Sequence, residues 1–392
     1  MSSEGLLAGF SSAPITTRGG LIGWGRSVIP CSGVNDPLMV NSLILEWKGS
    51  RIALIALDLL AIDFAEAGAI RSRIANIGVR PENVLIAASH THCGPASIDH
   101  CSVEKNQELV DEIVGKAEKC AGEAADSLAP ASIRTAFTEF PDSMNRRQRN
   151  WLGRTIIGVN SRGPVDHQLS CVALETEHAK ILLLCYGCHP VINRGSLESA
   201  DYVAGSRQGA VSAGFKGSLF LNGALGDVNP YDRRNQQSLV GTGIDPALDF
   251  GGRITRNALS ALSHEKDDPT PQVVSASATL DVSLPRLRAG EMGRQLLVQA
   301  FRIGRLVLVT FPGEIFAQTS LDLRKKSAIS NLAIASCANG YIGYVPPRTE
   351  YARGGYEIEE VPRLLGYRVP AGIAEDLQSI AEKLIASRLQ AQ

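Results

Sequence analysis

Two histidines, His90 and His92, stand one residue apart in the stretch ASHTHCGPA, directly after the apolar run NVLIA. Four other apolar runs also end in polar residues, which are His189, then Asn222 with Asp227 and Asn229, then Glu314, and last Asn339 with Tyr341 and Tyr344. Imidazole nitrogens and carboxylate oxygens are ligands that catalytic zinc prefers. The pattern therefore indicates a zinc site in which about three protein ligands leave one position open for water.

The spacing of His90 and His92 predicts that both point to the same side of an extended backbone. At least one of them could then bind the metal while the other faces the same cleft. Two acidic residues also have simpler interpretations. Glu314 follows Pro-Gly and could belong to the first turn of a helix, and Asp201 in SADYVAG could be an N-cap.

The elements that must position these residues alternate along the chain. Apolar runs rich in β-branched residues predict strands at 51–57, 83–89, 180–186, 218–223, 305–311 and 331–337. Apolar residues at helical spacing predict helices at 65–77, 104–127, 202–215, 315–326 and 371–390. Residues 270–303 alternate as antiparallel strands do, and the glycine-rich stretch 241–252 is expected to form a loop.

This alternation predicts an α/β fold, with one domain over residues 1–392 and a mixed, mostly parallel sheet flanked by helices. Ligands of such sheets bind outside the carboxyl ends of the strands. We therefore expect the active site at those ends, where the polar residues gather.

The composition argues against several classes of protein. The chain has 39 basic and 40 acidic residues and no long basic run, which argues against binding to nucleic acid. The chain contains no stretch of about 18 apolar residues, so the sequence predicts no membrane-spanning helix. Because the N-terminus lacks the pattern of a secretory signal, we expect a cytoplasmic protein whose eight cysteines are reduced. The oligomeric state is not indicated.

Other motifs are weaker. The stretch CYGCH matches the C-x-x-C-H of haem attachment, but Cys185 ends a predicted strand, so we expect Cys185 and Cys188 to be thiols without haem or a disulfide. No second C-x-x-C completes a structural zinc site, and the G-x-S-x-G elbow of common serine hydrolases is absent.

Taken together and in order, the motifs resemble those of the neutral (non-lysosomal) ceramidase family. SHTHCGP is similar to the family's H-T-H-S-G-P, CHP to its second histidine motif, GDVNP to its G-D-V-S-P-N, and FPGE to its P-G-E. GYIGYV, with EY and YE after it, is similar to the family's tyrosine-rich segment, and MNR to its N-R-S. The resemblance is spread over most of the chain and corresponds to the catalytic domain only, since the separate C-terminal β-domain of larger ceramidases is expected to be missing.

The resemblance implies a catalytic zinc and a set of site residues. Carried over by position, the zinc ligands are His90, His189, Glu314 and Tyr344. His92, Arg146 and Tyr356 are implied to line the reacting carbonyl, and Asp227 and Asn229 to contact the substrate. The family's mechanism, attack of zinc-bound water on an amide, would make His92 a proton shuttle that titrates near neutrality.

Two departures from the family pattern bear on the substrate. The serine of G-D-V-S-P is Asn229 here, and the serine after H-T-H is Cys93. We therefore expect an amidohydrolase that acts on a small soluble amide rather than on ceramide. An esterase or lactonase with the same chemistry is an alternative, and so is a metal-binding or small-molecule-binding protein of the same fold without catalysis.

Overall fold

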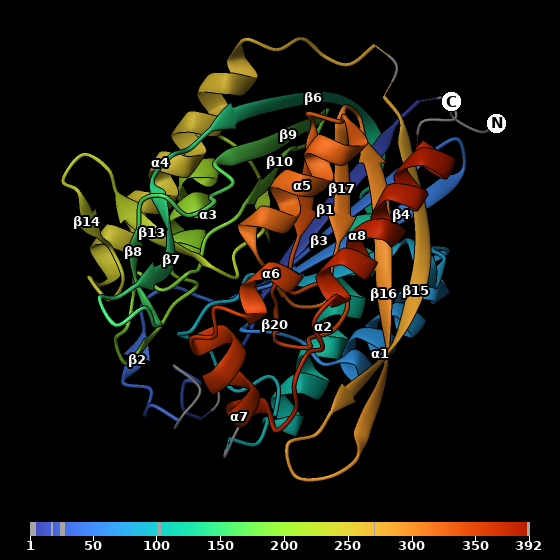
Figure 1. Ribbon diagram of the computed structural model, residues 1–392. Coiled ribbons are helices and arrows are strands. Elements are labelled where there is room, and N and C mark those ends of the chain that lie inside the picture. The colour runs from blue at the N-terminus through green and yellow to red at the C-terminus, as the bar shows by residue number, and fades with distance from the viewer. Residues whose placement is uncertain (1–4, 17–18, 24–27, 100–102, 270, 390–392) are drawn as a thin grey trace.

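The computed structural model describes residues 5–16, 19–23, 28–99, 103–269 and 271–389. It contains two large sheets packed face to face (Figure 1). The first sheet has eight strands, in the spatial order β12 (Gly217–Asn222), β10 (Lys180–Tyr186), β9 (Gln168–Thr176), β6 (Ala129–Glu139), β1 (Leu7–Pro14), β3 (Met39–Trp47), β4 (Ser50–Leu57) and β5 (Val84–Ala88). The second has four, in the order β15 (Val273–Pro285), β16 (Glu291–Ile303), β17 (Leu306–Thr310) and β19 (Leu332–Ala335).

Three smaller sheets complete the strands of the described residues. They are the sheet β14 (Gln237–Ser238), β13 (Val228–Asp232), β7 (Ser143–Arg149) and β8 (Thr155–Asn160), the pair β18 (Glu314–Ile315) and β20 (Tyr344–Val345), and the pair β11 (Leu197–Glu198) and β2 (Gly33–Val34). The α-helices are α1 (Phe64–Ile74), α2 (Gln107–Asp126), α3 (Tyr202–Ser212), α4 (Ile244–Ser263), α5 (Ala317–Ser327), α6 (Arg348–Tyr351), α7 (Val361–Leu365) and α8 (Ile373–Leu384). Short 3₁₀ or π turns lie at Ala75–Ile77, Pro81–Asn83, Tyr356–Glu360 and Ile385–Leu389.

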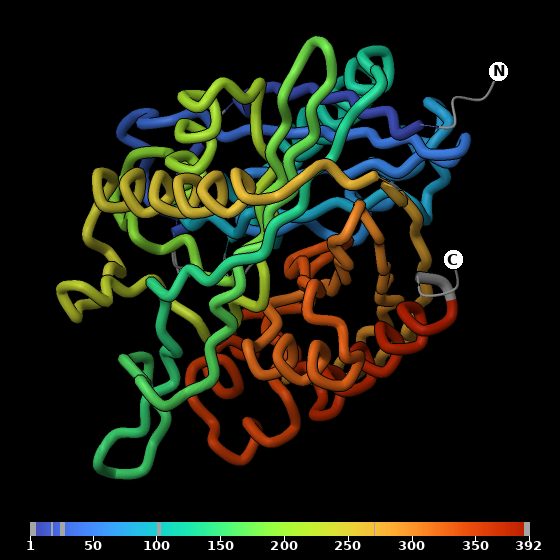
Figure 2. Tube along the Cα trace, turned by 90° about the horizontal axis from the view of Figure 1, so that it is seen from above, coloured from blue at the N-terminus to red at the C-terminus, as the bar shows by residue number. Residues whose placement is uncertain are grey.

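The alternation of side chains along the strands produces a four-layer sandwich. In β10, Leu182 and Leu184 face the helices α1 to α4, whereas Ile181 and Leu183 face the second sheet. In the second sheet, Leu308 faces the first sheet, and its neighbours in β17 pack against α5 and α8. Strands buried on both faces read as continuous apolar runs, which explains why these strands are visible in the sequence. Figure 2 shows the two sheets between their helices.

The mixed α/β fold is confirmed, but the expectation of a mostly parallel sheet is wrong. In the first sheet only β4 with β5 and β10 with β12 are parallel, and the other neighbours are antiparallel. The second sheet is antiparallel except where β17 pairs with β19. The expected antiparallel strands at 270–303 are confirmed as β15 and β16. Strands β1, β3, β6 and β9 were not expected, and they supply most of the antiparallel pairs.

The stretch 241–252, expected to be a loop, belongs largely to helix α4. Its glycines serve close packing between helices, because a Cβ at Gly251 would lie only 1.9 Å from the carbonyl oxygen of Tyr202 in α3. Likewise, a Cβ at Gly205 in α3 would lie 2.2 Å from the carbonyl oxygen of Leu248. Glycine lowers helix propensity, so the sequence pattern concealed a helix that tertiary packing stabilises.

Alanine at Gly251 is expected to destabilise the protein by about 1–3 kcal/mol, because the added methyl group must push α3 and α4 apart. Gly252 is the matched control, since the nearest atom to its Cβ would be the flexible Arg256 Nη1 at 3.3 Å. Gly252→Ala should stabilise the helix by about 0.5–1 kcal/mol. Urea unfolding midpoints measure both effects, and equal midpoints for the two variants would contradict this account of the packing.

Candidate functional site

The ends of three strands are joined by hydrogen bonds. Asn222, at the end of β12, donates from Nδ2 to the carbonyl oxygen of Ser89 beyond β5 (2.9 Å), and its own carbonyl accepts from the amide of Ser336 beyond β19 (2.8 Å). The amide of Ala88, at the end of β5, donates to the carbonyl oxygen of Cys337 (3.1 Å). These bonds tie the first sheet to the second at the place where the polar residues follow the strands.

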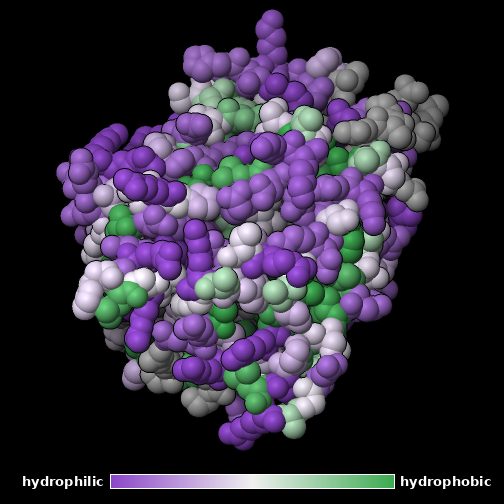
Figure 3. All heavy atoms as spheres, in the orientation of Figure 1, coloured by the Kyte–Doolittle hydropathy of each residue, from purple (hydrophilic) through white to green (hydrophobic). Residues whose placement is uncertain are grey.

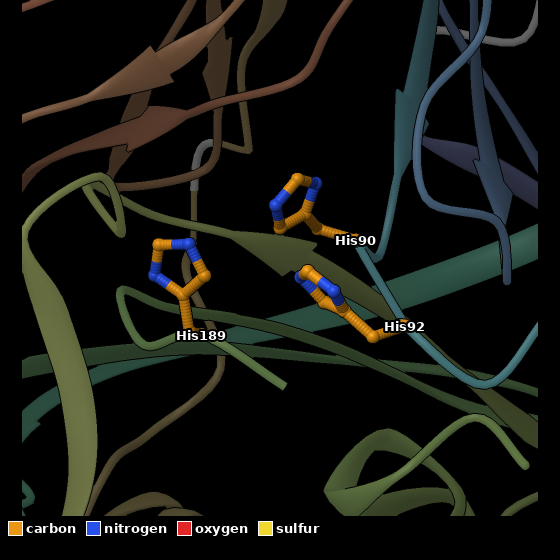
Figure 4. Close-up of side chains that lie close together, drawn as sticks. All are labelled: His90, His92 and His189. Atoms are coloured by element: carbon orange, nitrogen blue, oxygen red, sulfur yellow. The ribbon is translucent and has the colours of Figure 1, made fainter. Parts of the chain in front are cut away.

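Three histidines gather at these strand ends. His90 and His92 follow β5 and His189 follows β10, and one ring nitrogen from each lies within 4.8 Å of the others. The ring centroid of His90 is 5.2 Å from that of His92 and 5.3 Å from that of His189. Figure 4 shows the three rings turned toward a common space. His90 and His189 are buried, whereas His92 is partly exposed.

The histidines do not converge in the way that the sequence spacing suggested. His90 has a φ of 70°, in the left-handed region, so the backbone is not extended there. Its amide donates to the carbonyl oxygen of Leu59 (2.8 Å), which helps to hold this turn. Backbone strain of this kind is concentrated at functional sites, because the surrounding structure must hold it.

Each histidine has its Nδ1 atom against a backbone carbonyl. The carbonyl oxygens belong to Leu60, Leu225 and Gly23, at 2.7 Å from His90, 2.6 Å from His189 and 2.8 Å from His92. A carbonyl oxygen only accepts, so each Nδ1–H donates and the neutral ring has its lone pair on Nε2. Such second contacts orient metal-binding histidines and fix their tautomer.

Glu314 and Tyr344 face the same space from the small sheet formed by β18 and β20. They are directly opposite each other in the parallel pair β18 and β20. Glu314 Oε2 lies 3.4 Å from His90 Nε2 and 3.0 Å from His189 Nε2, and the Tyr344 hydroxyl lies 3.3 Å from His189 Nε2. The Tyr341 hydroxyl donates to Glu314 Oε1 (2.6 Å). Glu314 is therefore part of this cluster and does not serve the first turn of a helix.

The electron pairs of this cluster fit a metal cation. Burial and the nearby Arg146 lower the pKa of His189 to about 4, so the ring is neutral at pH 7. Burial opposes the charges of both His90 and Glu314, but their contact raises the pKa of His90 well above and lowers the pKa of Glu314 well below the usual range, so without a metal these two side chains form an ion pair. A lone pair on Nε2 of His189 and a carboxylate oxygen thus face each other at 3.0 Å. A cation between two nitrogens and an oxygen would relieve that repulsion, and this donor set suits zinc.

Arg146 approaches the cluster from strand β7. Its guanidinium donates from Nη2 to the Tyr344 hydroxyl (2.8 Å), from Nη1 to His189 Nε2 (3.1 Å) and from Nε to Glu357 Oε1 (2.9 Å). Burial opposes the charge of Arg146, but Tyr344 and Glu357 raise its pKa. Arg146 is thus held as a cation beside the possible metal ligands.

The other expected site residues differ in their surroundings. The ring of Tyr356 lies 6.1 Å from that of Tyr344, and burial raises the pKa of Tyr356 to about 12. The Asn229 side-chain oxygen lies 3.4 Å from Arg146 Nη1. Asp227 is buried, and its carboxylate accepts from the amide of Ala317 (2.8 Å) and from Asn145 Nδ2 (2.7 Å). These bonds commit Asp227 to holding the start of α5.

The expectation that His92 titrates near neutrality is wrong for this structure. Burial, together with His90 and His189, lowers the pKa of His92 well below its ordinary value.

The expected N-cap at Asp201 is confirmed, since its side chain accepts from the amide of Tyr202 (2.7 Å).

Glu357 and Arg147 were not expected at the site. Glu357 is buried and contacts both Arg146 and Arg147, and Arg147 also pairs with Glu350 (3.0 Å). The only sequence signal was the pair of adjacent arginines inside a strand, because two buried cations require carboxylate partners elsewhere in the chain.

The seven cysteines among the described residues are free thiols, and Cys101 lies outside the described part of the chain. Cys185 and Cys188 are buried, and the Cys185 thiol donates to the carbonyl oxygen of Ile334 (3.1 Å). Within the described residues, no helix has the length and hydrophobicity to cross a membrane.

Comparison with known proteins shows which fold this is. No protein-family model matches the chain, and no curated protein sequence matches it. Several solved structures match, and two of them cover 97% of this chain. One is described as a ceramidase complexed with C2, with a TM-score of 0.79, 16% identity and 75% of that chain covered. The other is the neutral ceramidase from Pseudomonas aeruginosa, with a TM-score of 0.77, 17% identity and 74% of that chain covered. The chain has the fold of neutral ceramidases, as the sequence resemblance implied.

Proposed function

We propose that this protein is a zinc-dependent hydrolase that cleaves the amide bond of a small N-acyl compound, with residues 1–392 acting as one catalytic domain. The observation that carries the proposal is the position of Glu314, whose carboxylate oxygen lies 3.4 and 3.0 Å from the Nε2 atoms of His90 and His189. Those histidines have their Nδ1 atoms engaged by carbonyls, so both Nε2 atoms face one point, where a bound metal would take the place of the proton on His90. The shared fold with neutral ceramidases supports the choice of an amide.

The proposed zinc ligands are His90, His189, Glu314 and Tyr344. Bound there, zinc would polarise the scissile carbonyl and lower the pKa of water toward neutrality. The ligand atoms follow strands of the first sheet or belong to the small sheet of β18 and β20, and all four residues are buried, which favours a site that is formed before the substrate binds.

The remaining residues of the cluster supply charge and proton transfer. The Arg146 guanidinium would donate hydrogen bonds to the developing oxyanion, and the phenol of Tyr356, protonated at neutral pH, would donate a further one. His92 is partly exposed and presents Nε2 beside the other two rings, so its neutral ring would take a proton from the attacking water and pass it to the leaving amine. Asn229 stands beside Arg146 and would contact the substrate directly. Asp227 would act on the substrate only indirectly, by holding the start of α5 in place.

The proposal is tested by turnover measurements on purified zinc-loaded protein with N-acyl amino acids, N-acyl amines, ceramide and lactones as substrates. We expect hydrolysis of N-acyl compounds, loss of activity with a chelator and recovery with added zinc. A zinc-loaded protein that hydrolyses none of these substrates would contradict catalysis and favour a binding protein, and hydrolysis of the lactones alone would contradict the amide.

His92→Ala is expected to lower turnover by about 10²–10⁴-fold, because general acid–base catalysis is worth that much. Zinc should stay bound at full stoichiometry, since the proposed ligand set excludes His92. Elemental analysis together with kcat measures both effects. Loss of zinc from this variant would make His92 a ligand, as the proximity of its ring nitrogen to those of His90 and His189 allows.

A further inference from the structure

The hairpin formed by β7 and β8 carries an unusual group of exposed apolar side chains. Nine large hydrophobic side chains of the described residues are exposed, and five of them belong to this hairpin, namely Trp151, Leu152, Ile156, Ile157 and Val159. Trp151 is 90% exposed. Figure 2 shows the tip of the hairpin projecting from the body of the protein, and on the face drawn in Figure 3 hydrophilic residues predominate. A concentration of exposed apolar groups marks an interaction surface.

The tip of the hairpin is an ordered turn. The Asn150 side-chain oxygen accepts from the amides of Leu152 and Arg154, both at 3.0 Å, and the Asn150 amide donates to the carbonyl oxygen of Arg154 (2.9 Å). Gly153 adopts a φ of 74°, which suits glycine. The turn thus fixes the backbone that holds Trp151 and Leu152 outward.

The hairpin is also basic. Residues 143–163 contain five arginines and no aspartate or glutamate. Arg146 and Arg147 point inward and are paired with Glu357. Arg149, Arg154 and Arg162 are exposed, and none of these three has a carboxylate partner among the described residues. The exposed apolar tip is therefore flanked by cations, although the whole chain has a net charge of -1.

The arrangement of the apolar side chains indicates what the hairpin contacts. Ile156 and Ile157 are adjacent in β8, so they point to opposite faces, and both are exposed, at 43% and 50%. A rigid partner docked on one face would leave the other face in water. A lipid interface surrounds the tip on both sides, accepts tryptophan at the level of the headgroups and attracts arginine when the lipids are anionic.

We propose that the β7–β8 hairpin anchors the protein to anionic lipid surfaces, with Trp151 and Leu152 entering the headgroup layer and the exposed arginines contacting lipid phosphates or carboxylates. Strand β7 carries Arg146, which stands five residues before Trp151 and is therefore at most roughly 17 Å away along the backbone. Anchoring would therefore hold the candidate site close to the lipid surface. The binding does not depend on which bond the protein cleaves.

The test is co-sedimentation of the full chain with vesicles of phosphatidylcholine alone or with about one-third phosphatidylglycerol. We expect binding to the anionic vesicles that weakens with salt. Trp151→Ser with Leu152→Ser should weaken that binding about tenfold or more, since two large side chains lose their burial. Arg149→Gln and Arg154→Gln should each weaken it about fivefold.

Val211→Ser is the matched control, because Val211 is also exposed (54%) but lies on α3. This variant should bind vesicles as the wild type does, and all variants should keep the wild-type melting temperature. Absence of binding to anionic vesicles, or equal binding by the Trp151 and Leu152 double variant, would overturn the proposal. Self-association that the double variant abolishes, without vesicle binding, would overturn it in favour of a contact between copies of the chain.

Discussion

Replacing His189 with alanine is expected to remove the bound metal and the hydrolytic activity together. His189 Nε2 lies 3.0 Å from Glu314 Oε2 and 3.3 Å from the Tyr344 hydroxyl, so it stands at the centre of the proposed ligand set. Its loss leaves at most one nitrogen among the four proposed ligands. Turnover should fall by at least about 10³-fold, because the metal contributes several kcal/mol to stabilising the transition state.

The measurement pairs zinc stoichiometry by elemental analysis with kcat on the best substrate. His178→Ala is the control, since the side chain of this histidine is 74% exposed and, among the described residues, forms an ion pair only with its neighbour Glu177. It should keep one zinc per chain and wild-type turnover. A His189→Ala protein that retains both zinc and activity would place the metal elsewhere and would remove the basis of the proposed function.

Much of the fold could be predicted because buried strands are visible as apolar runs. Strands such as β10 and β17 are apolar on both faces, and their ends are marked by polar residues. Strand β7, in contrast, reads SMNRRQR, and its arginines become buried only because carboxylates from distant segments pair with them. Helix α4 was missed because its glycines suggest a loop in the sequence, whereas in the structure they allow α3 to pack closely against α4.

Of the candidate site, too, one part could be predicted from the sequence and another part could not. That polar residues follow strand ends was evident from the sequence, and hydrogen bonds between those ends explain why the residues meet. Tyr344 as a ligand came from the family resemblance alone. Glu357 could not be found by spacing, because its partner Arg146 lies 211 residues away in the sequence. The pairing exists only when β7 and the segment after β20 come together.

Replacing Arg146 is expected to have the second large effect on turnover, and the same replacement at the neighbouring Arg147 is the control. Arg146→Lys keeps a positive charge but loses the planar fork that reaches His189, Tyr344 and Glu357 together. Turnover should fall by about 10²–10³-fold, the loss expected for one oxyanion donor, while zinc remains bound. Arg147→Lys changes a buried arginine that also pairs with Glu357 but makes no hydrogen bond to His189 or Tyr344. It should lower stability and leave turnover per folded molecule within about threefold.

Stability and catalysis can be separated further at Arg146. Arg146→Ala removes one partner of a buried carboxylate, a change that costs about 3–5 kcal/mol when no other cation is near. Because Arg147 still contacts Glu357, we expect a loss at the lower end of that range. Adding Glu357→Gln to Arg146→Ala should recover part of the stability, because the buried carboxylate that lost its partner is then replaced by a neutral amide. It should recover no activity. Thermal unfolding and kcat of the single and double variants measure the two effects. Recovery of turnover in the double variant would show that Arg146 acts only by neutralising Glu357, and wild-type turnover in Arg146→Lys would remove the guanidinium from the proposed mechanism.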